Sequence, residues 1–365
     1  MMRGAVFAGD ARIELLDFPD PQPGPGEVVL RIDASGLCGS DLHTLKRPAV
    51  PGGYVSVDPS RSDAVIAGHE PVGTVVERGA GVSDEQARLG MRAVCFHYSG
   101  CGACAYCRMG RQQLCSQTRG YGGTAHGGHA DFMVVPVETL VALPDDVSDE
   151  AAACLACGSG TAFGALKRLP QVDGETIVVV GLGPVGASTV MFANAMGARV
   201  IGVDIDPGRR EAATTYGADV VLDPAADDIV ATVRAATDGF GASGAIETSG
   251  TTPGRRSALL ATRPEGSAVF VGLGGGMWEL DFDREVVMAP RAVIGTRTFS
   301  KPELVECVDL VARLGIPVDS LVTRRHPLDD VQAAYDEFAA GGIGKHVIVN
   351  SGSSTSGRQR EVDDR

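Results

Sequence analysis

The most restrictive pattern in the sequence lies near its middle, where an apolar run leads into three closely spaced glycines. Residues 176–180 form the apolar run, Gly181, Gly183 and Gly186 follow it, and an apolar stretch of helical length comes next. In a strand–turn–helix unit of this kind, the first glycine permits the tight turn and the second lets the backbone approach a pyrophosphate. The third lets the helix pack on the strand, and the helix N-terminus holds the phosphates. The pattern therefore predicts a dinucleotide-binding unit.

The residues of this turn are the first candidates for cofactor contacts, and we expect them to be Gly181, Gly183, Pro184, Val185 and Gly186. A second apolar run, residues 199–203, ends in Asp204, 18 residues after Gly186. An acidic side chain at this place accepts hydrogen bonds from the adenosine ribose and repels a 2′-phosphate, which favours NAD(H) over NADP(H). Arg209 and Arg210 follow closely, either as adenosine contacts or as solvated charges at a helix start.

The pattern of apolar runs and turn residues changes near residue 150. Six short β-branched runs that we expect to be strands cover residues 176–180, 199–203, 219–222, 244–247, 268–271 and 292–294. Most of the gaps between them can hold a helix, and such alternation builds a parallel, doubly wound α/β sheet. The first 150 residues instead hold short apolar runs punctuated by glycine and proline, which indicates a β-rich unit.

Helical patterns cover residues 303–314 and 328–340 near the end of the chain, and a strand-like run covers residues 346–349. The Ser/Gly-rich and charged tail, residues 351–365, is expected to be disordered.

Four of the nine cysteines form a compact group, with the spacing C-x₂-C-x₂-C-x₇-C; they are Cys101, Cys104, Cys107 and Cys115. Four thiolates that leave no vacant position are typical of a closed, structural zinc site. An iron–sulfur cluster is disfavoured because no proline follows the last cysteine and no second set is present. The odd number of cysteines and their clustering do not fit a secreted disulfide framework, so we expect a cytoplasmic protein.

A second set of metal-ligand residues is dispersed over three segments, which contain Cys38, then His69 with Glu70, then Cys154 and Cys157. Each segment alone is a weak signal. Together they offer a thiolate, an imidazole and a second thiolate with a fourth position open, which is the arrangement of catalytic zinc. The spacing alone leaves Cys154 and Cys157 as alternatives for the third place.

Charge and hydropathy exclude other classes of function. The net charge of −14 repels a phosphate backbone, so neither a nucleic-acid partner nor a zinc-knuckle module that binds one is favoured. Residues 176–198 carry no charge, but three glycines and a proline divide the stretch into a strand, a turn and a helix. We therefore expect no membrane span.

These motifs occur in an order that resembles a known family. The segments are Cys38-Gly-Ser-Asp-Leu-His43, Gly68-His69-Glu70, the four-cysteine group, Cys157-Gly-Ser-Gly-Thr-Ala-Phe-Gly164 and the glycine turn. Over about residues 1–350 the sequence resembles the zinc-dependent medium-chain alcohol and polyol dehydrogenases. The resemblance implies a GroES-like catalytic domain, a Rossmann domain and a C-terminal return that completes the catalytic domain. Their expected limits are residues 1–157, with the zinc lobe at 95–116, then 158–298 and 299–350.

The resemblance also implies roles for residues of the dispersed set. Cys38, His69 and Cys157 would bind the catalytic zinc, and Glu70 would approach or transiently replace a ligand. Cys157 is preferred to Cys154 because in relatives the ligand directly precedes the glycine of this helical turn.

Further roles implied by the resemblance concern proton transfer and the cofactor. Ser40 and His43 match a proton relay, Asp41 a partner that orients His69, and Lys345 a basic residue that contacts the cofactor phosphate. Gly39 stands where the animal liver enzymes of the family have an arginine on the pyrophosphate, which removes one phosphate contact.

The function that this resemblance implies is hydride transfer between an alcohol, secondary in the favoured case, and its ketone or aldehyde. The expected cofactors are NAD(H) and two zinc ions per chain, and the expected assembly is a homodimer or homotetramer. A sugar-alcohol or cyclitol dehydrogenase of the same family is the first alternative. A zinc-free quinone or enoyl reductase relative would normally lack Cys38, His69 and the four-cysteine lobe, all of which are present.

Overall fold

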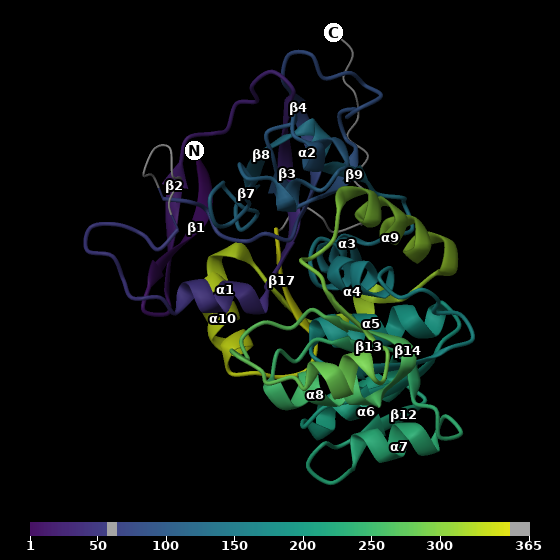
Figure 1. The fold of residues 1–365 in the computed structure, drawn as a ribbon. Coiled ribbons are helices and arrows are strands. Elements are labelled where there is room, and N and C mark those ends of the chain that lie inside the picture. The colour runs from purple at the N-terminus through teal and green to yellow at the C-terminus, as the bar shows by residue number, and fades with distance from the viewer. Residues whose placement is uncertain (57–63, 351–365) are drawn as a thin grey trace.

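Two large β-sheets, each with its own helices, form the fold of this chain (Figure 1). The structure is a computed structural model, and it describes residues 1–56 and 64–350. The tail predicted to be disordered, residues 351–365, lies outside the described residues.

The six-stranded sheet is parallel throughout, in the order β12-β11-β10-β13-β14-β15. Its strands are β10 (Thr176–Val180), β11 (Arg199–Val203), β12 (Val220–Leu222), β13 (Ala242–Glu247), β14 (Thr262–Phe270) and β15 (Ala292–Gly295). The helices of this part are α4 (Gly158–Leu166), α5 (Pro184–Ala195), α6 (Pro207–Thr215), α7 (Ile229–Ala235) and α8 (Thr252–Ala261). The predicted doubly wound sheet is confirmed. Strand β14 begins earlier than residue 268, because Thr262 already pairs with Ala242 across an irregular register.

The strand order of this sheet reverses between β10 and β13. At such a point the connections leave toward opposite faces, so a crevice opens at the carboxyl ends of the strands. The glycine turn after β10 lies at this crevice.

The second sheet has seven strands in the order β16-β17-β3-β4-β5-β9, with β8 also paired to β3. Its strands are β3 (Glu27–Gly36), β4 (Pro71–Arg78), β5 (Arg92–Cys95), β8 (Phe132–Pro136), β9 (Leu140–Ala142), β16 (Val322–His326) and β17 (Lys345–Val349). Two smaller sheets pair β1 (Met2–Gly9) with β2 (Arg12–Phe18), and β6 (Tyr98–Ser99) with β7 (Arg119–Gly120). The remaining α-helices are α1 (Gly39–Leu45), α2 (Ala105–Arg108), α3 (Asp149–Leu155), α9 (Lys301–Leu314) and α10 (Val331–Ala339). Short 3₁₀ or π turns cover Gln112–Leu114, Val137–Thr139, Asp283–Val287, Val318–Leu321 and Leu328–Asp330.

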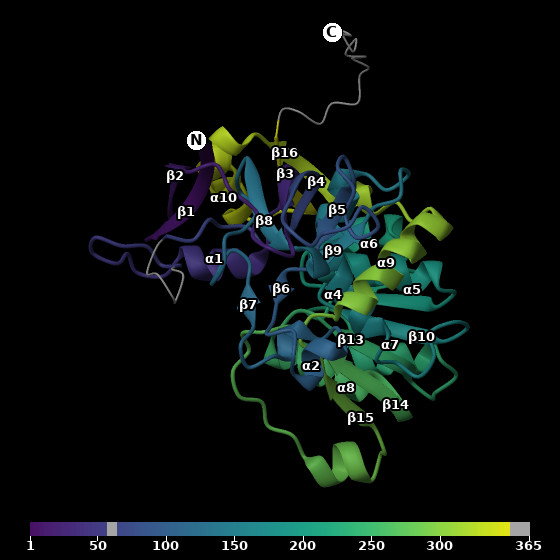
Figure 2. The ribbon, with the colours of Figure 1, turned by 90° about the horizontal axis from the view of Figure 1, so that it is seen from above.

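The end of the chain returns to the sheet built by its beginning. Strand β17 runs antiparallel to β3, with Val347 opposite Gly36, and β16 runs parallel to β17. Figure 2 shows the C-terminal β16 and α10 beside the N-terminal strands, although some 300 residues separate them. This pairing brings α10 and β17 next to α1, where the first site residues lie. The exact domain limits stay a prediction.

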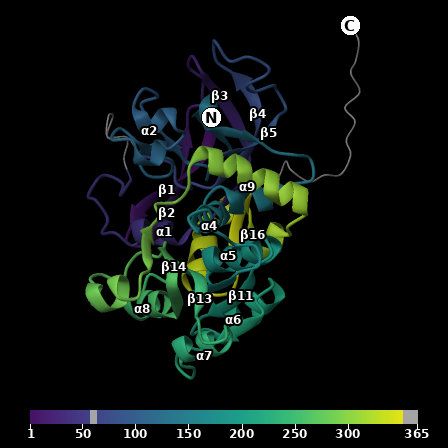
Figure 3. The ribbon, with the colours of Figure 1, turned by 45° about the vertical axis from the view of Figure 1, so that its right-hand side comes forward.

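Helices α4 and α9 connect the two sheets through a shared apolar core. Helix α9 packs on α4, which in turn packs on α5 (Figure 3). Phe299, just before α9, is fully buried in the same cluster as Phe163 and Phe192. Replacing one such phenylalanine with alanine typically costs about 3–5 kcal/mol, so this contact contributes strongly to holding the two units together.

The uncharged stretch of residues 176–198 is divided as expected into β10, the glycine turn and α5. No helix within residues 1–56 and 64–350 combines the length and hydropathy needed to cross a bilayer.

Candidate active site

Four metal-ligand side chains from three segments meet at the junction of the two units. Cys38 precedes α1, His69 and Glu70 precede β4, and Cys157 lies between α3 and α4. One donor atom from each of these residues lies within 4.8 Å of the other three. Thiolate, imidazole and carboxylate are all donors that zinc accepts, so the residues present fit a zinc ion. The structure thus brings together every residue predicted for the catalytic metal.

The two cysteines of this group differ in protonation. A hydrogen bond from Cys157 lowers the pKa of Cys38 well below its usual range, and the neighbouring His69 and Lys345 lower it further against the effect of burial. The same hydrogen bond, together with burial, raises the pKa of Cys157. Cys38 is therefore the residue that offers a ready thiolate, which is the form that binds a metal.

Cys154, the alternative to Cys157, lies in α3 and is not a member of this group. Its thiol is buried, and burial raises its pKa to about 12. Its side chain therefore packs as a small apolar group outside the metal-ligand group. The geometry therefore favours Cys157, although its role as a ligand stays a prediction.

Asp41 holds the imidazole of His69. Its Oδ1 lies 2.9 Å from Nδ1 of His69, so in the neutral ring Nδ1 carries the proton and Nε2 offers the lone pair. The other carboxylate oxygen accepts the backbone N–H of Cys38 at 3.0 Å and the hydroxyl of Tyr335 at 3.0 Å. One carboxylate on the first turn of α1 thus fixes two of the predicted ligands.

The Asp41 network continues into the protein through two residues that the motifs do not reveal. The Tyr335 hydroxyl donates to Asp41 and accepts from Nε2 of His129, at 2.9 Å. Both side chains are fully buried, and burial lowers the pKa of His129 to about 4. The neutral His129 ring therefore donates to Tyr335 and stiffens the support behind His69.

Lys345 has a partner that the sequence does not indicate. Its ammonium lies 2.6 Å from the carboxylate of Glu70, and both side chains are almost completely buried. Burial alone would lower the pKa of Lys345, but the charges of Glu70 and Cys38 raise it. Burial raises the pKa of Glu70 to about 8 in spite of the ammonium. Lys345 also borders a small void with Pro184 at the start of α5, and its predicted contact with a cofactor phosphate stays a prediction.

Ser40 and His43, the predicted proton relay, lie on α1 close to Cys38. Both side chains are exposed, and both follow Cys38 within two turns of helix. The helix therefore places two proton-carrying groups at the surface within five residues of Cys38. Their role in proton transfer stays a prediction.

His97 is a further residue of this site that the motifs do not mark. Its ring centroid lies 5.5 Å from that of His69, and its Nδ1 is 2.7 Å from the carbonyl of Ala156. Burial lowers its pKa to about 3, so the ring is neutral and Nδ1 is the donor. Phe299 packs edge-on against it, which makes this wall of the site apolar.

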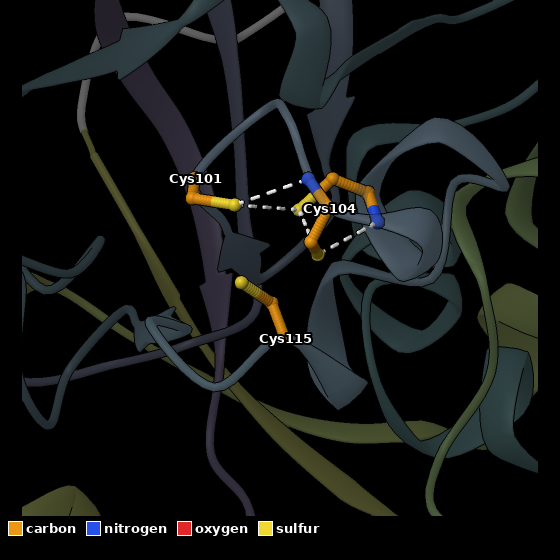
Figure 4. A group of neighbouring side chains, drawn as sticks. Cys101, Cys104 and Cys115 are labelled. Atoms are coloured by element: carbon orange, nitrogen blue, oxygen red, sulfur yellow. Dashed lines mark hydrogen bonds between the residues drawn. The ribbon is translucent and has the colours of Figure 1, made fainter.

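The four-cysteine lobe forms a second metal-ligand group. The donor sulfurs of Cys101, Cys104, Cys107 and Cys115 all lie within 4.8 Å of one another. Figure 4 shows the labelled cysteines pointing toward a common centre. The sulfur of Cys107 is 3.5 Å from that of Cys104 and 3.9 Å from that of Cys101. A tetrahedral zinc with Zn–S of about 2.3 Å separates its sulfurs by roughly 3.8 Å, so the residues fit the predicted structural zinc.

Four of the dinucleotide candidates, Gly181, Gly183, Asp204 and Arg209, line a cleft of about 540 Å³ at the carboxyl ends of the parallel strands. Pro184, Val185 and Gly186 of the same turn are not among its lining residues. Thr248, Ser249 and Thr251, which follow β13, also line this cleft. The sequence does not single out these three residues, because a Ser/Thr loop carries no motif. The position of the cleft is the one that the strand order predicts for a ligand.

Asp204, which follows β11, lines this cleft. Its carboxylate accepts the backbone N–H groups of Leu182 at 2.6 Å and Asp206 at 2.8 Å. Arg209 borders the cleft with one nitrogen 3.9 Å from the same carboxylate, whereas Arg210 pairs with Asp223 at 3.0 Å. The structure therefore separates the two arginines, and only Arg209 is placed to meet a nucleotide.

Comparisons with known proteins agree with this arrangement. Residues 24–145 match the model of the alcohol dehydrogenase GroES-like domain, and residues 184–313 match that of the zinc-binding dehydrogenases. A zinc-type alcohol dehydrogenase-like protein of Escherichia coli is 32% identical over 95% of this chain and 98% of its own length. The D-arabitol-phosphate dehydrogenase of Enterococcus avium is 30% identical over 94% of this chain and 95% of its own length.

The fold has a solved counterpart in a zinc-binding dehydrogenase from Sinorhizobium meliloti that was crystallised with NADP. The two structures superpose with a TM-score of 0.84 at 26% identity, over 96% of this chain and 99% of the other.

Proposed function

The chain belongs to the zinc-dependent medium-chain dehydrogenases, an oxidoreductase family that acts on small alcohols with a nicotinamide cofactor, and we propose that it interconverts a secondary alcohol and its ketone with NAD(H). The observation that carries the proposal is the group of Cys38, His69 and Cys157, whose donor atoms lie within 4.8 Å of one another. When bound, zinc supplies a Lewis acid that lowers the pKa of an alcohol hydroxyl, and the nicotinamide accepts the hydride.

The chain's own residues have separate tasks in this proposal. Cys38, His69 and Cys157 hold the zinc ion, and Asp41 keeps the His69 ring in the orientation that presents Nε2. Glu70 is held by Lys345, which leaves three protein donors in the resting site and makes Glu70 a reserve ligand. The apolar wall around His97 and Phe299 limits the access of water.

Proton transfer is assigned to helix α1. The Ser40 hydroxyl receives the proton that leaves the alcohol, and His43 passes it to solvent from its exposed position. This assignment rests on the short distance along the helix from Cys38 and on the exposure of both side chains.

Charge at the adenosine end supports NAD(H) over NADP(H). Asp204 is buried, with 7% of its surface exposed, and it lines the cleft in which the adenosine ribose would lie. A 2′-phosphate there would meet this negative charge at close range. Arg209 offsets part of that repulsion from 3.9 Å away.

A sugar alcohol is the second candidate substrate, because a relative that shares 30% identity acts by name on D-arabitol phosphate. A polyol would present a row of secondary hydroxyls to the same zinc site. In either case, we propose that the four-cysteine lobe holds a structural zinc, that the protein is cytoplasmic and that it assembles as a homodimer or homotetramer.

The test is a panel of secondary alcohols, sugar alcohols and sugar-alcohol phosphates, with NAD⁺ and NADP⁺ reduction followed by nicotinamide absorbance. Cys38→Ala and Cys157→Ala should lower turnover on the order of a thousandfold, because the Lewis acid contributes several kcal/mol. Cys154→Ala is the matched control and should retain turnover. Full activity of a verified zinc-free Cys38→Ala protein would refute the proposal.

A further inference from the structure

Among the residues that the structure describes, one more group of metal-ligand side chains lies outside both predicted zinc sites. It consists of His326, Glu337 and His346, whose donor atoms lie within 4.8 Å of one another. The nearest pair, Nε2 of His326 and Nδ1 of His346, is 3.2 Å apart. One oxygen of Glu337 lies 3.8 Å from Nε2 of His326. Neither the sequence motifs nor the family match assigns any role to these three residues.

The spacing of the donor atoms suits a small divalent transition metal. With metal–nitrogen bonds of about 2.0–2.1 Å, two ligands of a tetrahedral ion are roughly 3.3 Å apart, close to the observed 3.2 Å between the histidines. Their ring centroids are 5.3 Å apart with an interplanar angle of 19°, so the two nitrogens face each other edge to edge. Two imidazoles and one carboxylate are a donor set that zinc, cobalt and nickel accept.

The surroundings hold these donors in place. Arg324 binds the far oxygen of Glu337 at 2.7 Å and leaves the near oxygen directed toward the histidines. The ring of Phe338 packs against His346, with centroids 5.4 Å apart. Burial lowers the pKa of His346, against the opposing charge of Glu337. The Glu337 side chain is 46% exposed, which provides an entry path for an ion from solvent.

The three ligands come from three elements of the C-terminal return. His326 ends β16, Glu337 lies in α10 and His346 is the second residue of β17. Neighbouring side chains on a strand point to opposite faces, so His346 and Lys345 face away from each other. An ion on one face of β17 would therefore hold the strand that carries Lys345 to Glu70 on the other face.

We propose that His326, Glu337 and His346 form a third metal site, which binds Zn²⁺ or a similar divalent transition metal and clamps β16, β17 and α10 together. The ion replaces the proton shared by the two imidazoles and is bound through nitrogen and oxygen only. With three protein ligands and an open face to solvent, the site is expected to bind its ion more weakly than the two cysteine-containing sites.

The experiment starts from the zinc-replete protein, dialysed against metal-free buffer. Equilibrium dialysis against micromolar Zn²⁺ should add one equivalent beyond the zinc retained at the cysteine sites, and thermal unfolding should shift to higher temperature. Titration with Co²⁺ should give weak visible bands without thiolate charge transfer, which separates this site from the other two. These measurements do not depend on turnover, so the third metal site is tested separately from the proposed dehydrogenase activity.

Two variants on one helix provide the matched comparison. Glu337→Gln removes a ligand from a half-exposed position and should weaken the additional binding by tenfold or more, on the order of the losses seen when metal sites are perturbed. Asp336→Asn changes the preceding carboxylate, which lies outside the group, and should leave the binding unchanged. A His326→Gln variant should behave as Glu337→Gln does. The proposal is overturned if no additional equivalent binds, if it persists in both ligand variants or if the cobalt form shows thiolate bands.

Discussion

The ammonium of Lys345 lies 2.6 Å from the carboxylate of Glu70, with exposed side-chain fractions of 4% and 0%. The two residues are 275 positions apart, and the pairing of β17 with β3 brings them together beside the metal-ligand group. A buried ion pair of this kind becomes expensive when one partner is removed, because the other charge is left without compensation.

Lys345→Met should therefore destabilise the protein by about 3–5 kcal/mol, measured as the free energy of unfolding in urea at pH 9, above the pKa of about 8 that burial gives Glu70. The matched control is Lys167→Met, because Lys167 and Glu306 also form a pair at 2.7 Å but are 42% and 50% exposed. That exposed pair should contribute about 1 kcal/mol or less. Equal effects of the two substitutions would show that burial does not govern the Lys345–Glu70 pair.

Asp41→Asn should weaken zinc binding at the Cys38 site by about 10- to 100-fold, because the amide no longer fixes the His69 ring as a carboxylate does. Tyr335→Phe removes one hydrogen bond to Asp41 and should have a smaller effect in the same direction. Zinc release to a competing chelator measures both. The zinc of the four-cysteine lobe is the internal control, and its release should not change.

Gly186→Ala and Gly183→Ala should separate folding from cofactor binding. A Cβ at Gly186 would overlap the carbonyl oxygen of Gly181, whereas a Cβ at Gly183 meets nothing within 4 Å. The first change should destabilise the protein by about 1–3 kcal/mol through overpacking. The second should leave the thermal midpoint unchanged and weaken NADH binding, measured by nicotinamide fluorescence, because the methyl group occupies the space of the pyrophosphate.

Asp204→Asn tests the nucleotide preference while keeping an oxygen for the N–H of Leu182. Removal of the charge should relieve about 1–2 kcal/mol of repulsion toward a 2′-phosphate, so the NAD-to-NADP ratio of kcat/KM should fall roughly five- to thirtyfold. Asp206→Asn changes a neighbouring carboxylate that does not line the cleft and serves as the control. An unchanged ratio in the Asp204 variant would remove this residue from the explanation of the preference.

Acid should destabilise the protein through its buried histidines. Burial lowers the pKa of His129 from 6.5 to about 4, so between these values the unfolded chain binds a proton that the folded protein excludes. Stability is therefore complete above about pH 6.5 and falls as the pH approaches 4, by on the order of 3 kcal/mol for this residue. His97, with a pKa of about 3, acts in the same direction.

His129→Gln provides the measurement for this pH dependence. Urea unfolding from pH 7 to pH 4 should show a shallower decline in the variant than in the parent protein, even though the variant starts from lower stability at pH 7. An identical slope in the two proteins would assign the acid sensitivity to other groups.

Local patterns predicted those parts of the site in which neighbouring residues act together. The glycine turn works within a single strand–helix unit, and the four cysteines span one short lobe, so their spacing alone indicated each site. The parallel sheet followed from the alternation of apolar runs. The dispersed set of Cys38, His69 and Cys157 is different, because each of its three segments alone is a weak signal and the resemblance to a family was needed to prefer Cys157 to Cys154.

Contacts between segments that are distant in the sequence were not indicated by any local sequence pattern. Nothing near Glu70 marks Lys345 as its partner, and nothing near Asp41 points to Tyr335 or His129. The pair of His326 and His346 is equally hidden, because they lie on adjacent parallel strands whose register no sequence pattern states.

The amino-acid sequence by itself determined the fold class, the glycine turn and the compact cysteine group, because each depends on interactions over a few residues. Only the tertiary structure decided which buried charges are paired and which side chains support His69. These outcomes depend on the return of the chain end to the first sheet, which places β17 and α10 against α1 and turns separate polar residues into one buried network.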